Sequence, residues 1–243
     1  MFHARVVFFF GFMLLASLLM AQNSFNGRIG FAGGYFPGWN FSNFDKINSF
    51  IELPNSQKFS NNGFFYQGGG GYVYIMIIPN LRIGGVGLGG NQIISSKTNF
   101  GSSKEIKFSQ SFGGLSVEYT SSISSLNISY GGIIGIGETK FYLKNLIGNS
   151  NWNDIWNDFK NTLGTNQSHS NLLSTNYLTL VPTLNFEYSL SRFTALRLGF
   201  GYTINFKSNW YLNENEKVQN VPFNKIGNSF YISGGILMGF FSN

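Results

Sequence analysis

The residues able to carry out chemistry are few, and a single histidine stands out among them. The chain has two histidines and no cysteine, and His3 lies in an apolar N-terminal segment. His169 lies between two serines, in a polar stretch that also holds Asp154 and Asp158. A histidine, a carboxylate and a hydroxyl are the parts of a hydrolytic site, but no nucleophile motif such as G-x-S-x-G accompanies them. We therefore predict no enzyme, and keep a hydrolase that uses His169 as the last of three hypotheses.

Residues 85–90 resemble a cofactor motif. They read Gly-Val-Gly-Leu-Gly-Gly and match G-x-G-x-x-G, a pattern in which a helix N-terminus meets a pyrophosphate. Residues 91–96 continue as a strand instead, so no helix follows to receive the phosphate. Glycines of this kind are expected where a sheet curves tightly. With one histidine beyond the N-terminal segment and no cysteine, a metal site lacks ligands as well. We expect no cofactor and no metal.

Charged residues on the polar side of alternating segments form the next candidate site. Glu187 and Arg197 lie on two successive segments, on either side of a turn centred near Phe193. In a hairpin, two such side chains lie opposite or diagonal to each other, within reach of an ion pair. Further charged residues are expected to point to the same side. We interpret the whole set as an interior charge network of Arg28, Arg82, Glu118, Glu187, Arg197 and Lys207.

Two long polar stretches carry apolar residues at helical spacing. The first spans residues 41–53, where Ser42 or Asn43 could cap a helix. In the second, apolar residues recur at i, i+3, i+4 and i+7, which is the pattern of an amphipathic helix. These helices can pack against each other, rest in a lipid leaflet, cover the end of the fold or bind a partner. The predicted loop helix surface consists of Phe44, Ile47, Ile51, Trp152, Ile155, Trp156 and Phe159.

The composition excludes an ordinary soluble domain. Charged residues make up 11% of the chain and aromatic residues 18%, whereas soluble domains have about 25% charged residues. No stretch after residue 21 has the roughly 18 apolar residues of a membrane helix, so the remaining structure that crosses a membrane is a closed β-barrel. The net charge of +6 comes from scattered basic residues. We therefore expect no nucleic acid partner, which would need a contiguous basic face.

The chain divides into an export signal and one domain. Residues 1–21 place His3 and Arg5 before the apolar run from Val6 to Met20, and they end in Leu-Met-Ala. This is the pattern of a cleavable signal peptide. We therefore predict a signal peptide over residues 1–21 and a single barrel domain over residues 22–243.

Alternation of apolar and polar residues predicts eight strands. It is clearest over residues 178–190 and 196–206, which form a hairpin with one wholly apolar face. The apolar parity changes at Gly113-Gly114, which we interpret as a β-bulge. A hairpin hidden in a long loop would raise the number of strands to ten. The eight strands are expected at about residues 27–36, 64–78, 81–95, 106–119, 126–143, 177–190, 196–206 and 230–240.

The connections between these strands alternate in length. Short periplasmic turns opposite long outer loops are typical of bacterial outer-membrane barrels. The short connections are residues 79–80, 121–125 and 191–194, and the mostly long ones are 37–63, 96–104, 144–175 and 213–227. This layout, over residues 22–243, resembles the small eight-stranded outer-membrane barrels of the OmpA transmembrane-domain, OmpX and OmpW class. Members of the class commonly end in phenylalanine, whereas this chain ends Phe-Phe-Ser-Asn.

The expected fold is all-β: an eight-stranded antiparallel up-and-down transmembrane barrel, with an interior just wide enough for side chains to fill. The resemblance implies the outer membrane of a Gram-negative cell envelope, with outer-membrane lipid and an envelope or surface protein as partners. Our first hypothesis is a non-enzymatic barrel with a structural, surface-interaction or partner-anchoring role. The second is a porin-like conduit for small apolar molecules, similar to OmpW, with lateral exit to lipid.

Overall fold

The computed structural model describes residues 30–52, 57–75, 77–97, 102–147, 169–206, 208–221 and 228–241. The predicted signal peptide, residues 1–21, lies outside these ranges. Within them, no helix is both long and apolar enough to cross a membrane. The elements are β1 (Gly30–Tyr35), β2 (Gly38–Ser42), α2 (Asp45–Asn48), β3 (Phe64–Tyr74), β4 (Leu81–Lys97), β5 (Ser102–Ile123), β6 (Leu126–Ile147), β7 (His169–Ser189), β8 (Thr194–Asn205), β9 (Tyr211–Leu212), β10 (Glu216–Lys217) and β11 (Ser229–Phe241).

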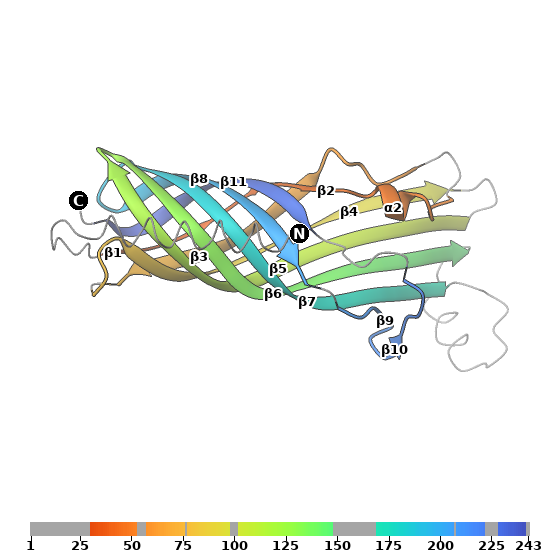
Figure 1. The fold of residues 1–243 in the computed structure, drawn as a ribbon. Coiled ribbons are helices and arrows are strands. Elements are labelled where there is room, and N and C mark those ends of the chain that lie inside the picture. Colours follow the sequence, from red (N-terminus) through yellow and green to blue (C-terminus); the bar gives the residue numbers. More distant parts are fainter. Residues whose placement is uncertain are drawn as a thin grey trace, which may run out of the picture.

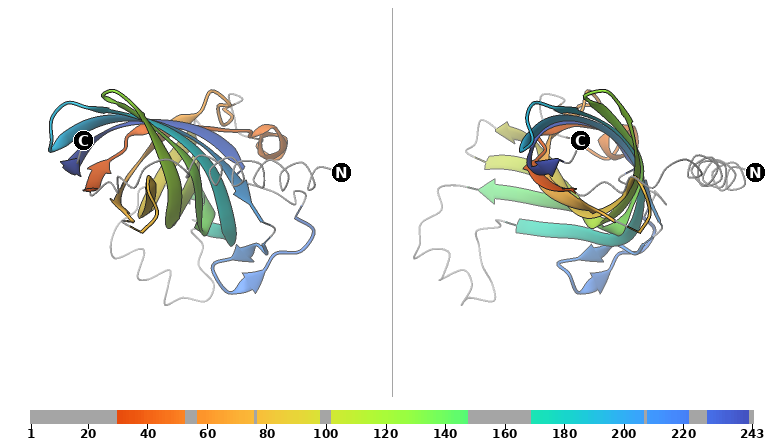
Figure 2. Two further views of the ribbon diagram at one scale, coloured as in Figure 1. Left: turned by 60° about the vertical axis from the view of Figure 1, so that its left-hand side comes forward. Right: turned by 90° about the vertical axis from the view of Figure 1, so that its left-hand side faces the viewer.

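Antiparallel pairing closes these strands into a barrel, seen end-on in the right-hand view of Figure 2. The strands from β3 to β8 pair in chain order, and β8 pairs with β11. β11 then pairs with both β1 and β2, and both of these pair with β3. β1 and β2 are therefore two halves of one barrel strand, and the ring that the described residues form has eight strands. The predicted fold class is confirmed.

The first barrel strand is longer than predicted, because it continues past Pro37. The sequence pattern assigns residues 37–63 to a loop, since proline cannot donate a ladder hydrogen bond. The proline carbonyl still accepts a hydrogen bond of 2.9 Å from the backbone N–H of Gly234, and the N–H of Phe36 donates one of 2.8 Å to Gly68. These bonds hold the kinked segment in the sheet, and the strand resumes at Gly38.

The two ends of the barrel differ strongly in Figure 1. The short turns lie at one end, where the first residue of β1 is paired with the last residue of β11. At the other end β4 to β7 project well beyond the ring (Figure 1). β5 and β6 have 22 residues each and β7 has 21, whereas β8 has 12 and β11 has 13. Parts of the predicted loops 96–104 and 144–175 are thus strand, because polar residues there obscure the alternation.

The parity change at Gly113-Gly114 is not a bulge. The pairing of β5 with β4 and with β6 runs through both glycines without a shift in register. Even-numbered residues of β5 face inward on both sides of this point: Glu118 and Phe108 are 3% and 1% exposed, whereas Leu115 and Val117 on the other parity are 73% and 50% exposed. The backbone is regular, and what changes is the side of the sheet on which apolar residues lie.

The change in parity marks the edge of the lipid-facing surface that lies away from the short turns. We call this the upper edge. Outward residues are apolar below it, for example Leu115 on β5, Ile136 on β6 and Leu178 on β7. Gly113, Ile136 and Leu178 are paired across the three strands, so the edge follows one row of the sheet. Above that row most outward residues of β5 to β7 are polar or charged, namely Ser111, Ser109, Lys107, Glu138, Lys140 and Asn176. The apolar exceptions are Tyr142, Leu172 and, on β4, Ile93. An apolar exterior band of this kind is what a transmembrane barrel presents to lipid.

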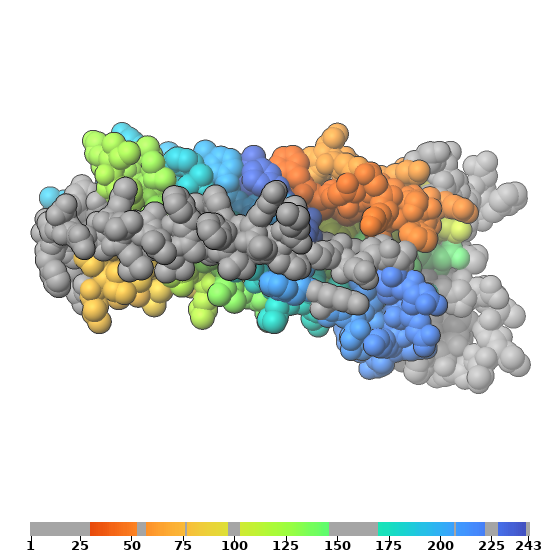
Figure 3. All heavy atoms as spheres, viewed as in Figure 1, coloured from red at the N-terminus to blue at the C-terminus, as the bar shows by residue number. Residues whose placement is uncertain are grey.

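About ten residues of β5, β6 and β7 continue above this row, which is about 33 Å of strand at about 3.3 Å per residue. Segments 43–52, 57–61 and 208–221 gather at the same end, where Figure 3 shows the first in orange and the last in blue. We call these segments and the outer ends of β4 to β7 the collar. The inner face of the collar sheet carries apolar side chains, including Ile94, Phe108 and Phe141.

Candidate functional site

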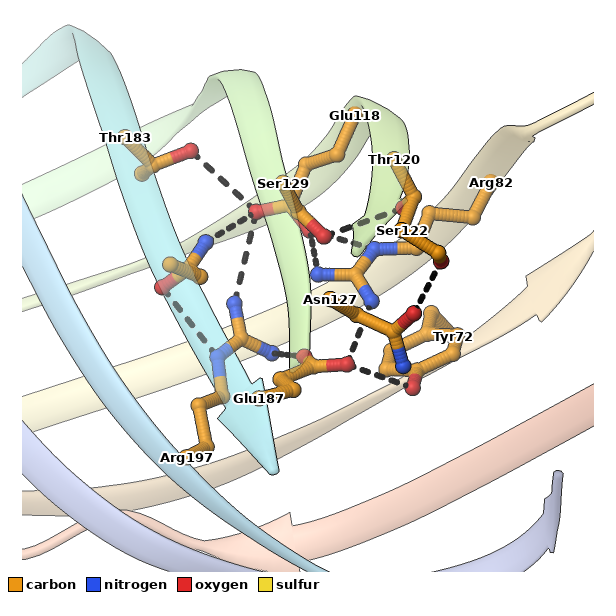
Figure 4. Close-up of polar contacts among 11 residues, drawn as sticks. Tyr72, Arg82, Glu118, Thr120, Ser122, Asn127, Ser129, Thr183, Glu187 and Arg197 are labelled. Atoms are coloured by element: carbon orange, nitrogen blue, oxygen red, sulfur yellow. Dashed lines mark hydrogen bonds and ion pairs between the residues drawn. The ribbon is translucent and has the colours of Figure 1, made fainter. Parts of the chain in front are cut away.

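Four charged side chains meet inside the half of the barrel nearest the short turns (Figure 4). Arg82 of β4 lies between Glu118 of β5 and Glu187 of β7, with N···O distances of 2.6 Å and 2.9 Å. Arg197 of β8 approaches the same two carboxylates at 3.3 Å and 3.5 Å. Two arginines and two glutamates therefore alternate around a ring of four ion pairs, which we call the quartet. Its net charge is zero.

Neutral side chains add hydrogen bonds to the quartet, although Arg82 Nη2 and Glu187 Oε1 have ion pairs and no hydrogen bond. Tyr72 donates a hydrogen bond of 2.9 Å to Glu187, and its ring centroid lies 4.0 Å from the guanidinium carbon of Arg82. Thr183 and Asn185 donate to Glu118 at 3.1 Å and 2.7 Å, and the Asn185 carbonyl accepts from Arg197. Buried charges are stable only when their partners are in place. Here Glu118 accepts hydrogen bonds from β4, β7 and β8, and Glu187 accepts them from β3 and β4.

The quartet closes the barrel interior. Arg82, Glu118 and Glu187 are at most 3% exposed, and Arg197 is 15% exposed. The cavity beside the quartet, which Tyr231 also lines, measures only about 30 Å³. That is room for one or two waters. The interior at this level holds side chains rather than an open path.

The structure brings together four of the six residues of the predicted charge network. Glu187 and Arg197 are direct cross-strand partners, as the hairpin pattern indicated. Arg28 and Lys207 lie outside the described residues. Sequence reasoning missed Tyr72, because its strand is rich in glycine and the phase of its side chains is blurred. It also missed the contact between β4 and β7, since strand tilt brings residues of non-adjacent strands together inside a narrow barrel.

Aromatic side chains fill the interior above the quartet, on the inner side of the collar. Phe44 packs edge-on against Phe108, with ring centroids 4.8 Å apart, and against Phe59 at 5.2 Å. Phe108 in turn lies 5.2 Å from Phe141, and Phe141 lies 5.8 Å from Trp210. Such pairs stabilise a core beyond the area that they bury. The collar therefore has a packed core of its own.

The first predicted loop helix is much shorter than expected. α2 spans only Asp45–Asn48, because β2 takes the residues before it and polar side chains tie the loop down after it. The Asn48 side chain donates to the carbonyl of Phe59 and accepts from its N–H, both at 2.9 Å. Phe44 is 2% exposed, and Ile47 and Ile51 pack partly buried against the collar core. These three residues thus cover the barrel end.

The second predicted loop helix, with Trp152, Ile155, Trp156 and Phe159, lies outside the described residues. The backbone of His169 begins β7. Asp154 and Asp158 lie outside the described residues, so the structure does not test the hydrolase hypothesis. Among the described residues, no cluster of His, Cys, Asp and Glu could hold a metal ion.

β9 and β10 form a hairpin, and β9 pairs with β7 at the edge of the collar sheet. β7 pairs with β8 up to Thr179 and Asn205, and above this point it pairs with β9, where Ser174 is opposite Tyr211. Asn213 strengthens the junction, because its backbone N–H and its side chain bond the main chain of Leu172 at 2.7 Å and 2.9 Å. β9 and β10 lie above the ring, so the barrel keeps eight strands rather than ten.

No protein-family model matches the chain, and no curated protein matches it. Solved structures that resemble it include a major outer membrane protein from Thermus thermophilus, with 10% identity and a TM-score of 0.47, over 87% of this chain and 99% of that one. OprG from Pseudomonas aeruginosa has 15% identity and a TM-score of 0.45, over 89% and 97%. The outer membrane protease OmpT from Escherichia coli has 8% identity and a TM-score of 0.35, over 90% and 99%.

The chain forms a small eight-stranded β-barrel with an apolar exterior band, which is the architecture of a transmembrane barrel. Its architecture rests on the strand pairing and the apolar exterior described above, because identities this low and TM-scores below 0.5 decide nothing about a site. Because one fold can host many unrelated functions, the barrel architecture leaves the activity of this chain open.

Proposed function

We propose that this barrel is a non-enzymatic anchor that holds a binding collar outside the outer membrane. The observation that carries the proposal is the change in parity at Gly113. Below it the apolar side chains of β5 face lipid, and above it they face a packed core while the outward side chains of β5 are polar. A strand needs only about ten residues to cross a membrane, so the further length of β5 to β7 serves something other than crossing.

The closed interior supports an anchoring role rather than a pore. The quartet fills the barrel at one level and the aromatic core fills it at another. An eight-stranded barrel has no room for a second path beside such side chains. In planar lipid bilayers we expect the purified protein to give no stable conductance steps. Steps that persist at constant voltage would overturn the anchoring proposal.

Surface labelling tests whether the collar stands outside the cell. Lys107 and Lys140 both lie on the polar exterior above the lipid-facing row. Glu138 accepts a hydrogen bond from Lys140 and raises its pKa, which keeps its amine protonated and slow to react. An amine reagent that cannot cross membranes should therefore label Lys107 in intact cells, and faster than Lys140. Labelling of Lys107 only after cell lysis would contradict the proposed orientation.

A conduit for small apolar molecules is the second candidate, and one observation favours it. A groove of about 950 Å³ lies at the upper edge of the lipid-facing surface, lined by Ile136, Leu178 and Phe206 among others. Trp210, four residues further along the chain, lines an apolar cavity in the collar. β7 lines both hollows, with Leu178 in the first and Leu173 in the second. In vesicles with an outer leaflet of lipopolysaccharide, which apolar molecules cross slowly, the protein should raise the rate of naphthalene uptake; equal rates with and without the protein would remove the conduit.

A further inference from the structure

We propose that the collar binds one small, uncharged, aromatic molecule in the cavity beneath the loop that carries α2. The cavity measures about 280 Å³ and lies between this loop, the inner face of β5 to β7 and segment 210–221. The proposal rests on the proposed function in one respect. The collar must stand in water outside the membrane, so that an apolar molecule gains by leaving water for the cavity.

The lining determines the chemistry of the ligand. It comes from separate parts of the chain and is apolar almost throughout, with side chains such as Ile51, Ile106, Leu143, Leu173 and Trp210. The polar side chains that line it are two neutral amides, Gln219 and Asn220. A charged ligand would lose its hydration there and find no counter-charge. The site therefore suits an uncharged molecule.

The size of the cavity suits a small molecule. An α-helix with its side chains is about 10–12 Å wide, and a protein partner needs about 800 Å² of contact surface. Apolar cavities of about 150 Å³ are known to stay dry and to take up benzene. A cavity of 280 Å³ is nearly twice that size, so two fused rings fit it. Phe50, Phe141 and Trp210 in the lining offer ring edges and faces to such a ligand.

The walls of the cavity are fixed by contacts that do not depend on a ligand. The rings of Trp210 and Phe141 are tilted against each other at 5.8 Å. The backbone N–H of Val218 donates a hydrogen bond of 2.8 Å to the carbonyl of Trp210, which closes segment 210–218 on itself. Leu173 is held by its pairing with Leu212 of β9. A site whose walls are already in place loses little free energy to ordering when it binds.

Naphthalene is the probe for this site, with the full chain in phosphatidylcholine nanodiscs and equilibrium dialysis as the measurement. After subtraction of empty nanodiscs, we expect one molecule per chain. Val218→Phe fills the cavity and should weaken binding by about tenfold or more, whereas Val117→Phe, the same change on the lipid-facing exterior, should leave it within about twofold. Leu143→Phe fills the cavity from β6 and gives a second filler if Val218→Phe fails to fold. A gel-mobility shift on heating reports folding for each variant.

The outcomes distinguish binding in the cavity from partitioning of the probe into lipid. They also distinguish failure of this proposal from failure of the proposed function. Equal binding by the filled variants and the Val117→Phe control would place naphthalene in the lipid and overturn the cavity proposal. Absence of binding above empty nanodiscs would overturn it too. Naphthalene-2-sulfonate should bind at least about tenfold more weakly than naphthalene, and equal binding would contradict an uncharged ligand. Labelling of Lys107 in intact cells decides the collar's position independently, so the anchor proposal can survive the loss of this site.

Discussion

Replacement of Arg82 by methionine changes the charge of a sealed site from zero to minus one. Both carboxylates of the quartet then depend on Arg197, which lies 3.3 Å and 3.5 Å from them. Removing one partner of a buried ion pair costs about 3–5 kcal/mol, because the charge that remains has lost its counter-charge. We expect Arg82→Met to lower the free energy of unfolding by that amount.

The double variant should restore part of the loss. Glu118→Gln alone leaves two arginines facing one carboxylate, for a net charge of plus one. Arg82→Met with Glu118→Gln leaves Glu187 and Arg197, which again sum to zero. The double variant should therefore be more stable than the sum of the single losses by roughly 1–3 kcal/mol, the range found for residues in direct contact.

Urea unfolding in lipid vesicles, followed by tryptophan fluorescence, measures these differences. Arg192→Met is the matched control, because Arg192 is exposed in the turn between β7 and β8. The control should stay within about 0.5 kcal/mol of the wild type. Losses at Arg82 and Glu118 that add to within about 0.5 kcal/mol would refute a direct interaction between them.

Three further predictions concern the exterior, the glycines and the collar core. Val117→Arg should cost about 2–4 kcal/mol in refolding into vesicles because Val117 faces lipid near the middle of the apolar band, and Ser109→Arg, above the lipid-facing row, should cost less than about 0.5 kcal/mol; equal costs would contradict the boundary. A Cβ at Gly135 would overlap a backbone carbonyl of the neighbouring strand, whereas one at Gly87 would meet nothing closer than 3.9 Å. Gly135→Ala should therefore lower the urea midpoint and Gly87→Ala should not, and the reverse order would refute the packing. Phe108→Ala should cost about 3–5 kcal/mol and speed proteolysis of the collar; an unchanged cleavage rate would mean that the collar core is loose.

The ring of strands could be predicted from the sequence because a barrel in lipid imposes one rule on every strand. Residues 178–190 alternate except at the inward Val181, and their apolar parity is the exposed one, with Leu178 63% exposed. The rule fails where the surroundings change. On β5 the apolar residues change sides at Gly113 because lipid ends there and the collar core begins, and a linear pattern does not distinguish this change of surroundings from a change of backbone.

Polar parity predicted which charged residues face the interior, but their pairing was predictable only where residues lie close in the chain. The hairpin between β7 and β8 placed Glu187 opposite Arg197, and turn geometry was sufficient for that. The position of Arg82 between Glu118 and Glu187 depends on the tilt of strands around a closed ring, which a linear pattern does not contain. The collar cavity depends on β9, whose pairing with β7 extends over two residues and leaves almost no periodic signal.

The most direct test of the central claim is a spin-label scan of the outward positions of β5. The chain has no cysteine, so single cysteines at Ser109, Ser111, Leu115 and Val117 can be labelled without background. In lipid vesicles, the labels at Ser109 and Ser111 should be accessible to a water-soluble nickel complex, and those at Leu115 and Val117 to oxygen dissolved in lipid. Labels at Ser109 and Ser111 that are shielded from water, by lipid or by the barrel interior, would contradict a collar that stands above the membrane on continuous strands.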